Sequence, residues 1–311
     1  MIEIKNLQKT YSGGVQALRG VDLQVPENIT TALVGESGCG KSTLAKLLIG
    51  LETPTQGSMT LDGKALMGMP LLERARTLQM IFQDSGSALN PRKKILDIIG
   101  EPLKIQNASA SQIKSKVFSL MEAVGLRPEM AERFPHMLSG GQKQRIGIAR
   151  ALITDPKYII CDESVSALDV SVQAQVLNLL YDLQKSRGLS LLFISHDLSV
   201  VRFISKRLAV MYLGKVVEEN LTEKAFQKPL HPYTQMLLMS LPTIHKKQAV
   251  VHSGSLELPS PINPPSGCAF HPRCPFAEAI CKEKVPELKE QQGGRVACHR
   301  SEQLDLSQGL R

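Results

Sequence analysis

The chain has 311 residues, of which 42% are hydrophobic and 21% charged, as in ordinary globular proteins. Its net charge is +8, but the basic residues are scattered, and aromatic residues make up only 4%, with no Trp. These features disfavour a stacking platform for single-stranded nucleic acid, and we expect no nucleic-acid partner. Because the chain shows neither a signal-peptide pattern nor a run of 18 apolar residues, we expect a cytoplasmic protein that reaches a membrane only through partners.

The first 34 residues have the pattern of β-strands separated by turns at 12–14 and 26–28. Residues 31–34 predict a short buried strand, and residues 43–50 have the composition of a helix. Tyr11 ends the first predicted strand. It is either a half-buried packing residue or, given its place upstream of the strand-to-helix connection, a platform for an adenine ring.

The connection at residues 35–42 reads GESGCGKS. Glycines let the backbone curl so that N–H groups point at phosphate oxygens, the lysine charge suits β- and γ-phosphates, and the serine hydroxyl suits a bridging Mg²⁺. We therefore predict a site for a nucleoside triphosphate with Mg²⁺ rather than an ordinary glycine-rich loop. The residues predicted to bind the nucleotide here are Gly35, Glu36, Ser37, Gly38, Cys39, Gly40, Lys41, Ser42 and Thr43.

Residues 92–135 carry apolar side chains at helical spacing and predict a helical subdomain. The next motif begins another helix and consists of Ser139, Gly140, Gly141 and Gln142. Ser139 is a suitable N-cap, and two glycines at a helix start form a second anion site, although Ser-Gly-Gly alone is usually only a turn.

Polar residues follow three other predicted strands. Gln83 comes after the strand at 78–82, and its amide oxygen could reach the metal or the attacking water, or it could be a turn residue. The strand at 158–163 ends in Asp162 and Glu163, which suit an Asp that serves Mg²⁺ and a Glu that polarises water, or an ordinary solvated strand end. His196 follows the strand at 189–194 and is either structural or a contact to the γ-phosphate.

Strands alternate with helices along the chain, which predicts an α/β fold with a largely parallel sheet. The carboxyl ends of such strands meet at one edge, where α/β proteins bind ligands. The candidates that follow strands are Gly35, Gln83, Asp162 and His196. That all four follow predicted strands is stronger evidence for a site at this edge than any one of these residues alone.

The composition of the sequence changes after about residue 221. Two short helices are predicted at 222–241, and a stretch rich in Pro, Ser and Gly follows at 255–275. Four of the six cysteines follow, namely Cys268, Cys274, Cys281 and Cys298. In a reducing cytosol clustered cysteines favour a metal over disulfides, and a loop-rich segment needs such a source of order. Four thiolates suit either Zn²⁺ or a [4Fe–4S] cluster.

The motifs together resemble the ATP-binding subunits of ABC transporters in order and spacing; they lie at 35–42, 83, 138–142, 158–163, 166–169 and 196. Further stretches at 83–92, 165–175, 231–234 and 257–268 resemble the dipeptide/oligopeptide/nickel importer family. The resemblance implies a P-loop NTPase of ABC type with a RecA-like core, an N-terminal antiparallel β part and a helical subdomain at about 92–150. It also implies an ATP-binding domain at 1–240 and a cysteine-containing extension at 241–311.

The resemblance further implies individual roles. Tyr11 stacks adenine, Gln83 contacts the metal and the membrane subunit, and His196 senses the γ-phosphate. Asp162 serves Mg²⁺, Glu163 polarises water, and the four late cysteines hold a [4Fe–4S] cluster. The motif at 138–142 contacts the γ-phosphate held by a sister subunit, and Asp169 lies in the loop that crosses to that subunit.

The implied partners are a homologous second ATPase, two integral membrane permease subunits and, through them, an extracytoplasmic substrate-binding protein. The implied function is ATP hydrolysis that powers peptide import from the cytoplasmic face of the inner membrane. Nickel or metal-chelate import, a soluble ABC-type protein acting on ribosomes or nucleic acid, and a non-hydrolysing regulatory module are the alternatives. The single glycine-rich loop in the chain argues against the second of these, and the presence of both Glu163 and His196 argues against the third.

Overall fold

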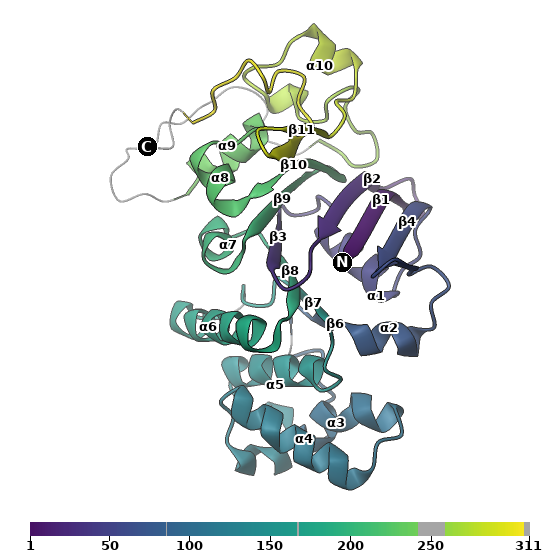
Figure 1. Ribbon diagram of the computed structural model, residues 1–311, viewed down its shortest axis with the longest axis vertical. Helices are drawn as coiled ribbons and strands as arrows, with labels where there is room; N and C mark the ends of the chain where they lie inside the picture. The colour runs from purple at the N-terminus through teal and green to yellow at the C-terminus, as the bar shows by residue number, and fades with distance from the viewer. Residues whose placement is uncertain (85, 167, 242–258, 308–311) are drawn as a thin grey trace. The chain divides into compact units, whose positions relative to one another are not determined.

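A computed structural model describes residues 1–84, 86–166, 168–241 and 259–307 (Figure 1). Residue 167 of the predicted crossing loop and the first part of the predicted extension, 242–258, lie outside the described residues. The chain divides into two compact units. The first comprises Met1–Val25, Thr31–Met67 and Ser195–Arg311, and the second comprises Pro26–Thr30 and Gly68–Ile194.

The first unit begins with an antiparallel sheet in the strand order β2-β1-β4-β5. Its strands are β1 (Ile2–Thr10), β2 (Gln16–Val25), β4 (Gln56–Leu61) and β5 (Lys64–Ala65). Alternate side chains such as Ile2 and Ile4 are buried, as expected of a sheet with one covered face. This confirms the predicted N-terminal antiparallel β part.

The same unit contains strands of the second sheet. Buried β3 (Thr30–Val34) pairs in parallel with β9 (Arg207–Tyr212), and β9 pairs antiparallel with β10 (Lys215–Leu221). The late strands β12 (Gly294–Val296) and β11 (Lys289–Gln291) continue this order beyond β10. The C-terminal residues are therefore joined by backbone hydrogen bonds to the strands of this unit.

Short helices complete the first unit: α1 (Lys41–Ile49), α7 (Leu198–Ile204), α8 (Thr222–Gln227), α9 (Pro232–Met239), the 3-10 turn η3 (His271–Arg273) and α10 (Ala279–Glu283). Tyr212, Tyr233 and Phe270 are fully buried and pack against one another, with ring centroids 4.6–5.3 Å apart. A strand, a helix and the cysteine-bearing segment thus share one aromatic core.

The second unit has a parallel sheet of β6 (Leu78–Ile81), β7 (Tyr158–Asp162) and β8 (Ser190–Ser195). Every residue of β7 and β8 is buried, as is typical of parallel strands covered on both faces. The parallel pairing that the sequence predicted therefore holds for this unit, whereas β10, β11 and β12 of the first unit pair antiparallel.

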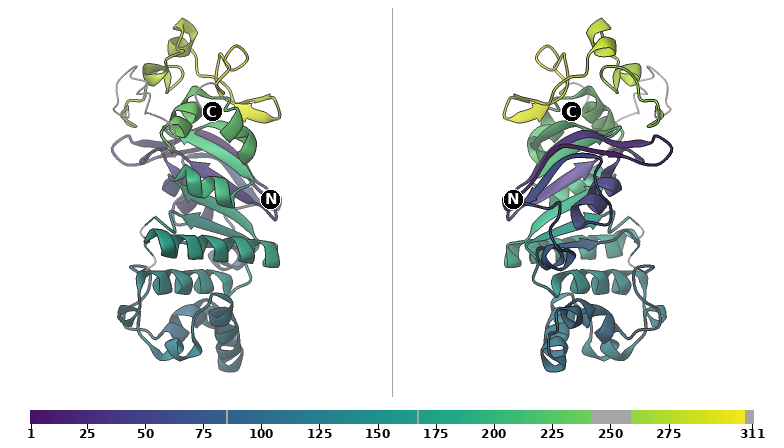
Figure 2. Two further views of the ribbon diagram at one scale, coloured as in Figure 1. Left: turned by 90° about the vertical axis from the view of Figure 1, so that its left-hand side faces the viewer. Right: turned by 90° about the vertical axis from the view of Figure 1, so that its right-hand side faces the viewer.

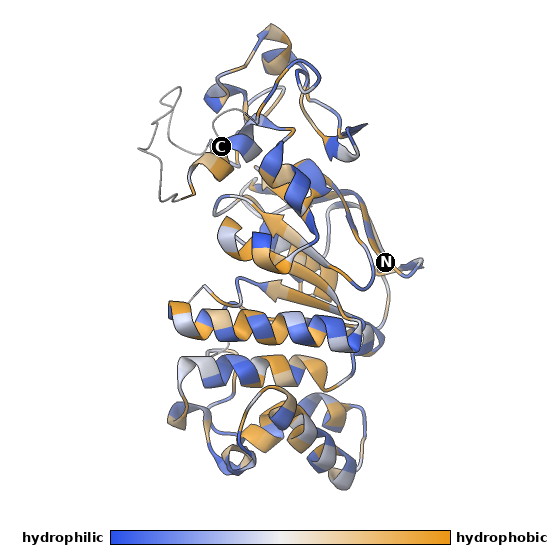
Figure 3. Ribbon diagram, turned by 60° about the vertical axis from the view of Figure 1, so that its left-hand side comes forward, coloured by the Kyte–Doolittle hydropathy of each residue, from blue (hydrophilic) through white to orange (hydrophobic). Residues whose placement is uncertain are grey.

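The helices of the second unit are α2 (Leu71–Thr77), α3 (Ile95–Ile105), α4 (Ala110–Ala123), η1 (Pro128–Glu132), η2 (Pro135–Met137), α5 (Gly140–Leu152) and α6 (Val170–Arg187). Both views of Figure 2 place α5 alongside α6, and α3 and α4 pack on α5. Figure 3 shows hydrophobic and hydrophilic residues alternating along α6, of which Val176, Leu180 and Leu183 are buried. Among the described helices, none is both long enough and apolar enough to cross a bilayer.

Candidate nucleotide-binding and catalytic site

The phosphate loop at 35–42 connects β3 to α1 in the first unit, as predicted. Gly40 precedes the helix with a left-handed φ of +107°, and its carbonyl accepts the N–H of Leu44 at 3.0 Å. A Cβ at Gly40 would lie 2.4 Å from the backbone oxygen of Ala17. Only glycine therefore suits both the backbone conformation and the space at this position.

Lys41 is buried, and its Nζ donates to the carbonyl oxygens of Gly35 at 2.7 Å and Glu36 at 3.0 Å. Cys39 Sγ lies 3.7 Å from the same Nζ, and burial raises the pKa of this thiol. Ser37, Gly38 and Ser42 are exposed to solvent. The loop thus combines a rigid inner side with an accessible outer side that suits phosphate oxygens.

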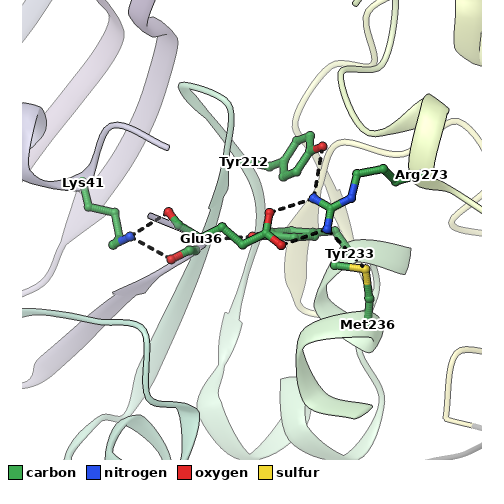
Figure 4. Close-up of polar contacts among 7 residues, drawn as sticks. Glu36, Lys41, Tyr212, Tyr233, Met236 and Arg273 are labelled. Atoms are coloured by element: carbon green, nitrogen blue, oxygen red, sulfur yellow. Dashed lines mark hydrogen bonds and ion pairs between the residues drawn. The ribbon is translucent and has the colours of Figure 1, made fainter. Parts of the chain in front are cut away.

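Glu36 is held by residues from the C-terminal part of the same unit (Figure 4). Its backbone N–H donates to Tyr233 Oη at 3.0 Å, and its carboxylate accepts from both terminal nitrogens of Arg273 at 2.7 and 2.9 Å. Sequence reasoning missed both partners. Tyr233 lies in the motif at 231–234 that marked the family, whereas no local sequence signal pointed to Arg273.

Tyr11 follows β1 and is half-buried, and its N–H donates to the carbonyl of Val15 at 2.9 Å. Lys9 Nζ lies 4.8 Å from the centroid of the Tyr11 ring, within cation–π range. The stacking of adenine on this ring stays a prediction.

In the second unit the structure brings Gln83 and Glu163 together, because Gln83 Nε2 donates to Glu163 Oε2 at 2.8 Å. Glu163 has a left-handed φ of +43°, which is uncommon for a residue with a side chain, and its N–H donates to Ile194 O at 3.0 Å. Asp162, the last residue of β7, is buried. The turn at Glu163 therefore begins directly after β7, and the Glu163 carboxylate there meets the side-chain amide of Gln83.

The motif that begins α5 has the predicted N-cap. Ser139 Oγ accepts the N–H of Gln142, and Gln142 Oε1 accepts the N–H of Ser139 at 3.0 Å, which is a capping box. Gly140 and Gly141 form the first turn, and a Cβ at Gly141 would lie 2.5 Å from Val172 Cγ1 in α6. Small residues thus keep this helix start open to an anion and close to α6.

Asp169 precedes α6 and is exposed, with its carbonyl accepting the N–H of Gln173 at 2.8 Å. His196 is exposed directly after β8, and the adjacent Asp197 caps α7 by accepting the N–H of Ser199 at 2.8 Å. The predicted site residues divide between the units. The phosphate loop, Tyr11, His196 and the four late cysteines belong to the first, and the others belong to the second.

The four late cysteines line one small cavity of about 10 Å³ in the first unit, together with His231 and Phe270. The cysteines are Cys268, Cys274, Cys281 and Cys298. Burial raises the pKa of the Cys268 thiol to about 11 and that of Cys274 to about 12. Within the described part of the chain, no three His, Cys, Asp or Glu side chains are arranged to hold a metal ion. The four cysteines therefore line one cavity without being arranged to hold a metal ion, and the [4Fe–4S] cluster stays a prediction.

Comparison with known proteins agrees with these motifs. Residues 18–166 match the family described as "ABC transporter", and residues 217–281 match "Oligopeptide/dipeptide transporter, C-terminal region". The chain is 48% identical over 297 residues to the di/tripeptide transport ATP-binding protein DppF of Pseudomonas aeruginosa, covering 93% of this chain and 91% of that protein. It is 49% identical over 296 residues to the oligopeptide transport ATP-binding protein AppF of Bacillus subtilis, covering 92% and 90%.

Among solved structures, a post-hydrolysis dimer of an ATP-binding cassette bound to ADP and Pi superposes with a TM-score of 0.65 at 29% identity, covering 71% of this chain and 99% of that one. The chain therefore belongs to the ABC transporter family as one of its ATP-hydrolysing ATP-binding proteins.

Proposed function

We propose that this chain is the subunit whose ATP hydrolysis powers the import of di- and oligopeptides through an inner-membrane ABC transporter. The observation that carries the proposal is the match to peptide-transport ATP-binding proteins over nearly the whole length of both chains. The match to the oligopeptide/dipeptide C-terminal region supports the same substrate class.

The geometry supports a division of labour among the nucleotide-binding residues. The backbone N–H groups at 35–42 and the Lys41 ammonium hold the phosphates, while Tyr11 stacks the adenine ring. We assign Mg²⁺ to Ser42, Gln83 and Asp162, because each carries a side-chain oxygen of the kind that this ion prefers as a ligand. Mg²⁺, when bound, neutralises charge on the β- and γ-phosphate oxygens.

Hydrolysis is assigned to Glu163, whose carboxylate polarises the attacking water and accepts its proton. Gln83 orients this carboxylate through the 2.8 Å hydrogen bond. His196 contacts the γ-phosphate from the end of β8. The left-handed turn at Glu163 supports this role, because strained backbone collects at active sites.

Two such subunits complete each other's sites. The capped helix start at Ser139, Gly140, Gly141 and Gln142 binds the γ-phosphate held by the phosphate loop of a homologous second ATPase, and Asp169 lies in the loop that crosses to it. Closure of the pair then depends on ATP, and loss of the γ-phosphate contact opens it again.

The remaining partners are two integral membrane permease subunits and, through them, an extracytoplasmic binding protein. This places the chain peripherally on the cytoplasmic face of the inner membrane. The test is affinity purification of the tagged chain from detergent-solubilised membranes. We expect the second ATPase and two integral membrane proteins to co-purify, and the ATPase rate of the complex to rise with a peptide-loaded binding protein. Recovery with ribosomes, or stimulation only by a nickel-loaded binding protein, would contradict the peptide assignment.

At the late cysteines we propose a structural [4Fe–4S] cluster, with Zn²⁺ as the alternative. Four thiols around one cavity provide the soft ligand set that both groups use, and a loop-rich segment needs such a source of order. Anaerobic purification followed by visible absorbance and assays of iron and sulfide tests this proposal. Colourless protein with stoichiometric zinc would refute the cluster.

A further inference from the structure

A C-terminal arginine is attached directly to the phosphate loop. Arg273 Nη1 donates to Glu36 Oε2 at 2.7 Å and Arg273 Nη2 donates to Glu36 Oε1 at 2.9 Å, which is a two-pronged ion pair. The Arg273 side chain is only 9% exposed and that of Glu36 24%, so water screens the ion pair weakly. The two residues lie 237 positions apart in the chain.

The surroundings of Arg273 fix its orientation. Its guanidinium carbon lies 5.8 Å from the ring centroid of Tyr212 and 5.9 Å from that of Phe270, and Nη1 also reaches Tyr212 Oη at 3.5 Å. Tyr233, packed on the same two rings, accepts the backbone N–H of Glu36. The aromatic core therefore holds Glu36 at both its side chain and its backbone.

The other side of the Glu36 peptide is bound by the phosphate-contacting lysine. Lys41 Nζ donates to the carbonyl oxygens of Gly35 and Glu36 (Figure 4). A shift of Glu36 would therefore move the carbonyl oxygens that bind Lys41 and tilt the neighbouring N–H groups away from the positions that phosphate oxygens need.

We propose that Arg273 is a positioning residue for nucleotide binding, which acts by holding Glu36 and thereby makes the cysteine-bearing segment part of the ATP site. Arg273 ends the turn η3 and directly precedes Cys274, whose N–H closes the turn on the carbonyl of His271 at 3.3 Å. The proposal rests on the proposed ATP-dependent function of the same loop.

The test is equilibrium binding of a fluorescent ATP analogue to the full-length chain, with kcat and KM measured in the purified transporter. Arg273→Gln should raise the Kd for the analogue about tenfold, the effect of one lost charge-assisted hydrogen bond. It should raise KM with little change in kcat, because Arg273 does not touch the reacting atoms. Arg273→Lys keeps the positive charge but cannot bind both carboxylate oxygens through two parallel hydrogen bonds, and it should raise the Kd about threefold. If Arg273→Gln does not fold, Arg273→Lys serves as the test variant.

The matched control is Glu278→Gln, which breaks another ion pair of the C-terminal segment, with Arg300 at 2.8 Å. Its Kd should equal that of the wild type. In a double-mutant cycle, the cost of Arg273→Gln should vanish when Glu36 is already Gln.

Two results would overturn this inference without touching the proposed function. In the first, the wild type and Arg273→Gln bind ATP with the same Kd. In the second, Arg273→Gln still raises the Kd when Glu36 is already Gln. The second would mean that Arg273 acts by its charge rather than through Glu36. A wild-type chain that bound no ATP would overturn the proposed function together with the inference.

Discussion

Replacement of Gly40 by Ala tests the geometry of the phosphate loop with one added carbon. The new Cβ would lie 2.4 Å from the backbone oxygen of Ala17 and 2.9 Å from side-chain carbons of Leu18 and Met211. A left-handed backbone costs a non-glycine residue about 1–2 kcal/mol, and overpacking adds about 1–3 kcal/mol. We expect the free energy of unfolding to fall by about 2–5 kcal/mol and ATP binding to weaken.

The matched control is Gly63→Ala in the turn between β4 and β5. Gly63 also has positive φ, at +79°, but an added Cβ would meet no atom within 4 Å. Only the conformational cost of about 1–2 kcal/mol remains, and ATP binding should not change. Urea unfolding of both variants, with binding of an ATP analogue, measures the difference. Equal losses of unfolding free energy in the two variants, or wild-type ATP binding by Gly40→Ala, would show that the added Cβ is accommodated without a clash.

Three further predictions concern the site and its surroundings. Glu163→Gln should retain ATP but lose at least about 100-fold in turnover, the typical effect of losing general-base catalysis, and unchanged turnover would remove its assigned role. Tyr233→Phe deprives the Glu36 N–H of its acceptor and should lower the free energy of unfolding by about 1–3 kcal/mol in urea titrations; no loss would show that this N–H finds another partner. Chelation of the metal group proposed at the late cysteines should weaken ATP binding of the wild type but not of Arg273→Gln, and equal weakening of both would show that the cysteine segment acts by another route.

The local parts of the site could be predicted from sequence because their signals are local. The buried run that became β7 is uniformly apolar up to Asp162, and Ser139 with Gln142 three residues later is a capping-box pattern. The strand, glycine-rich turn and helix around residues 35–42 likewise depend on neighbouring residues alone.

The features that escaped prediction depend on distant residues or on backbone angles. The pairing of Glu36 with Arg273 joins opposite ends of the chain, and no composition or spacing rule connects two such positions. The left-handed φ of Glu163 is imposed by the strand end around it, since Glu has no preference for that conformation. Glu218 is a further example, because this buried carboxylate accepts the N–H groups of Leu230 and His231 at the start of α9.

The coupling of ATP turnover by this chain to peptide import can be measured in the assembled transporter. Its most direct test is uptake of a labelled dipeptide into proteoliposomes that contain the whole transporter, with ATP on the side of this subunit and the loaded binding protein on the other. We expect ATP-dependent accumulation with the wild type and none with Glu163→Gln. Equal accumulation with both proteins would contradict this coupling.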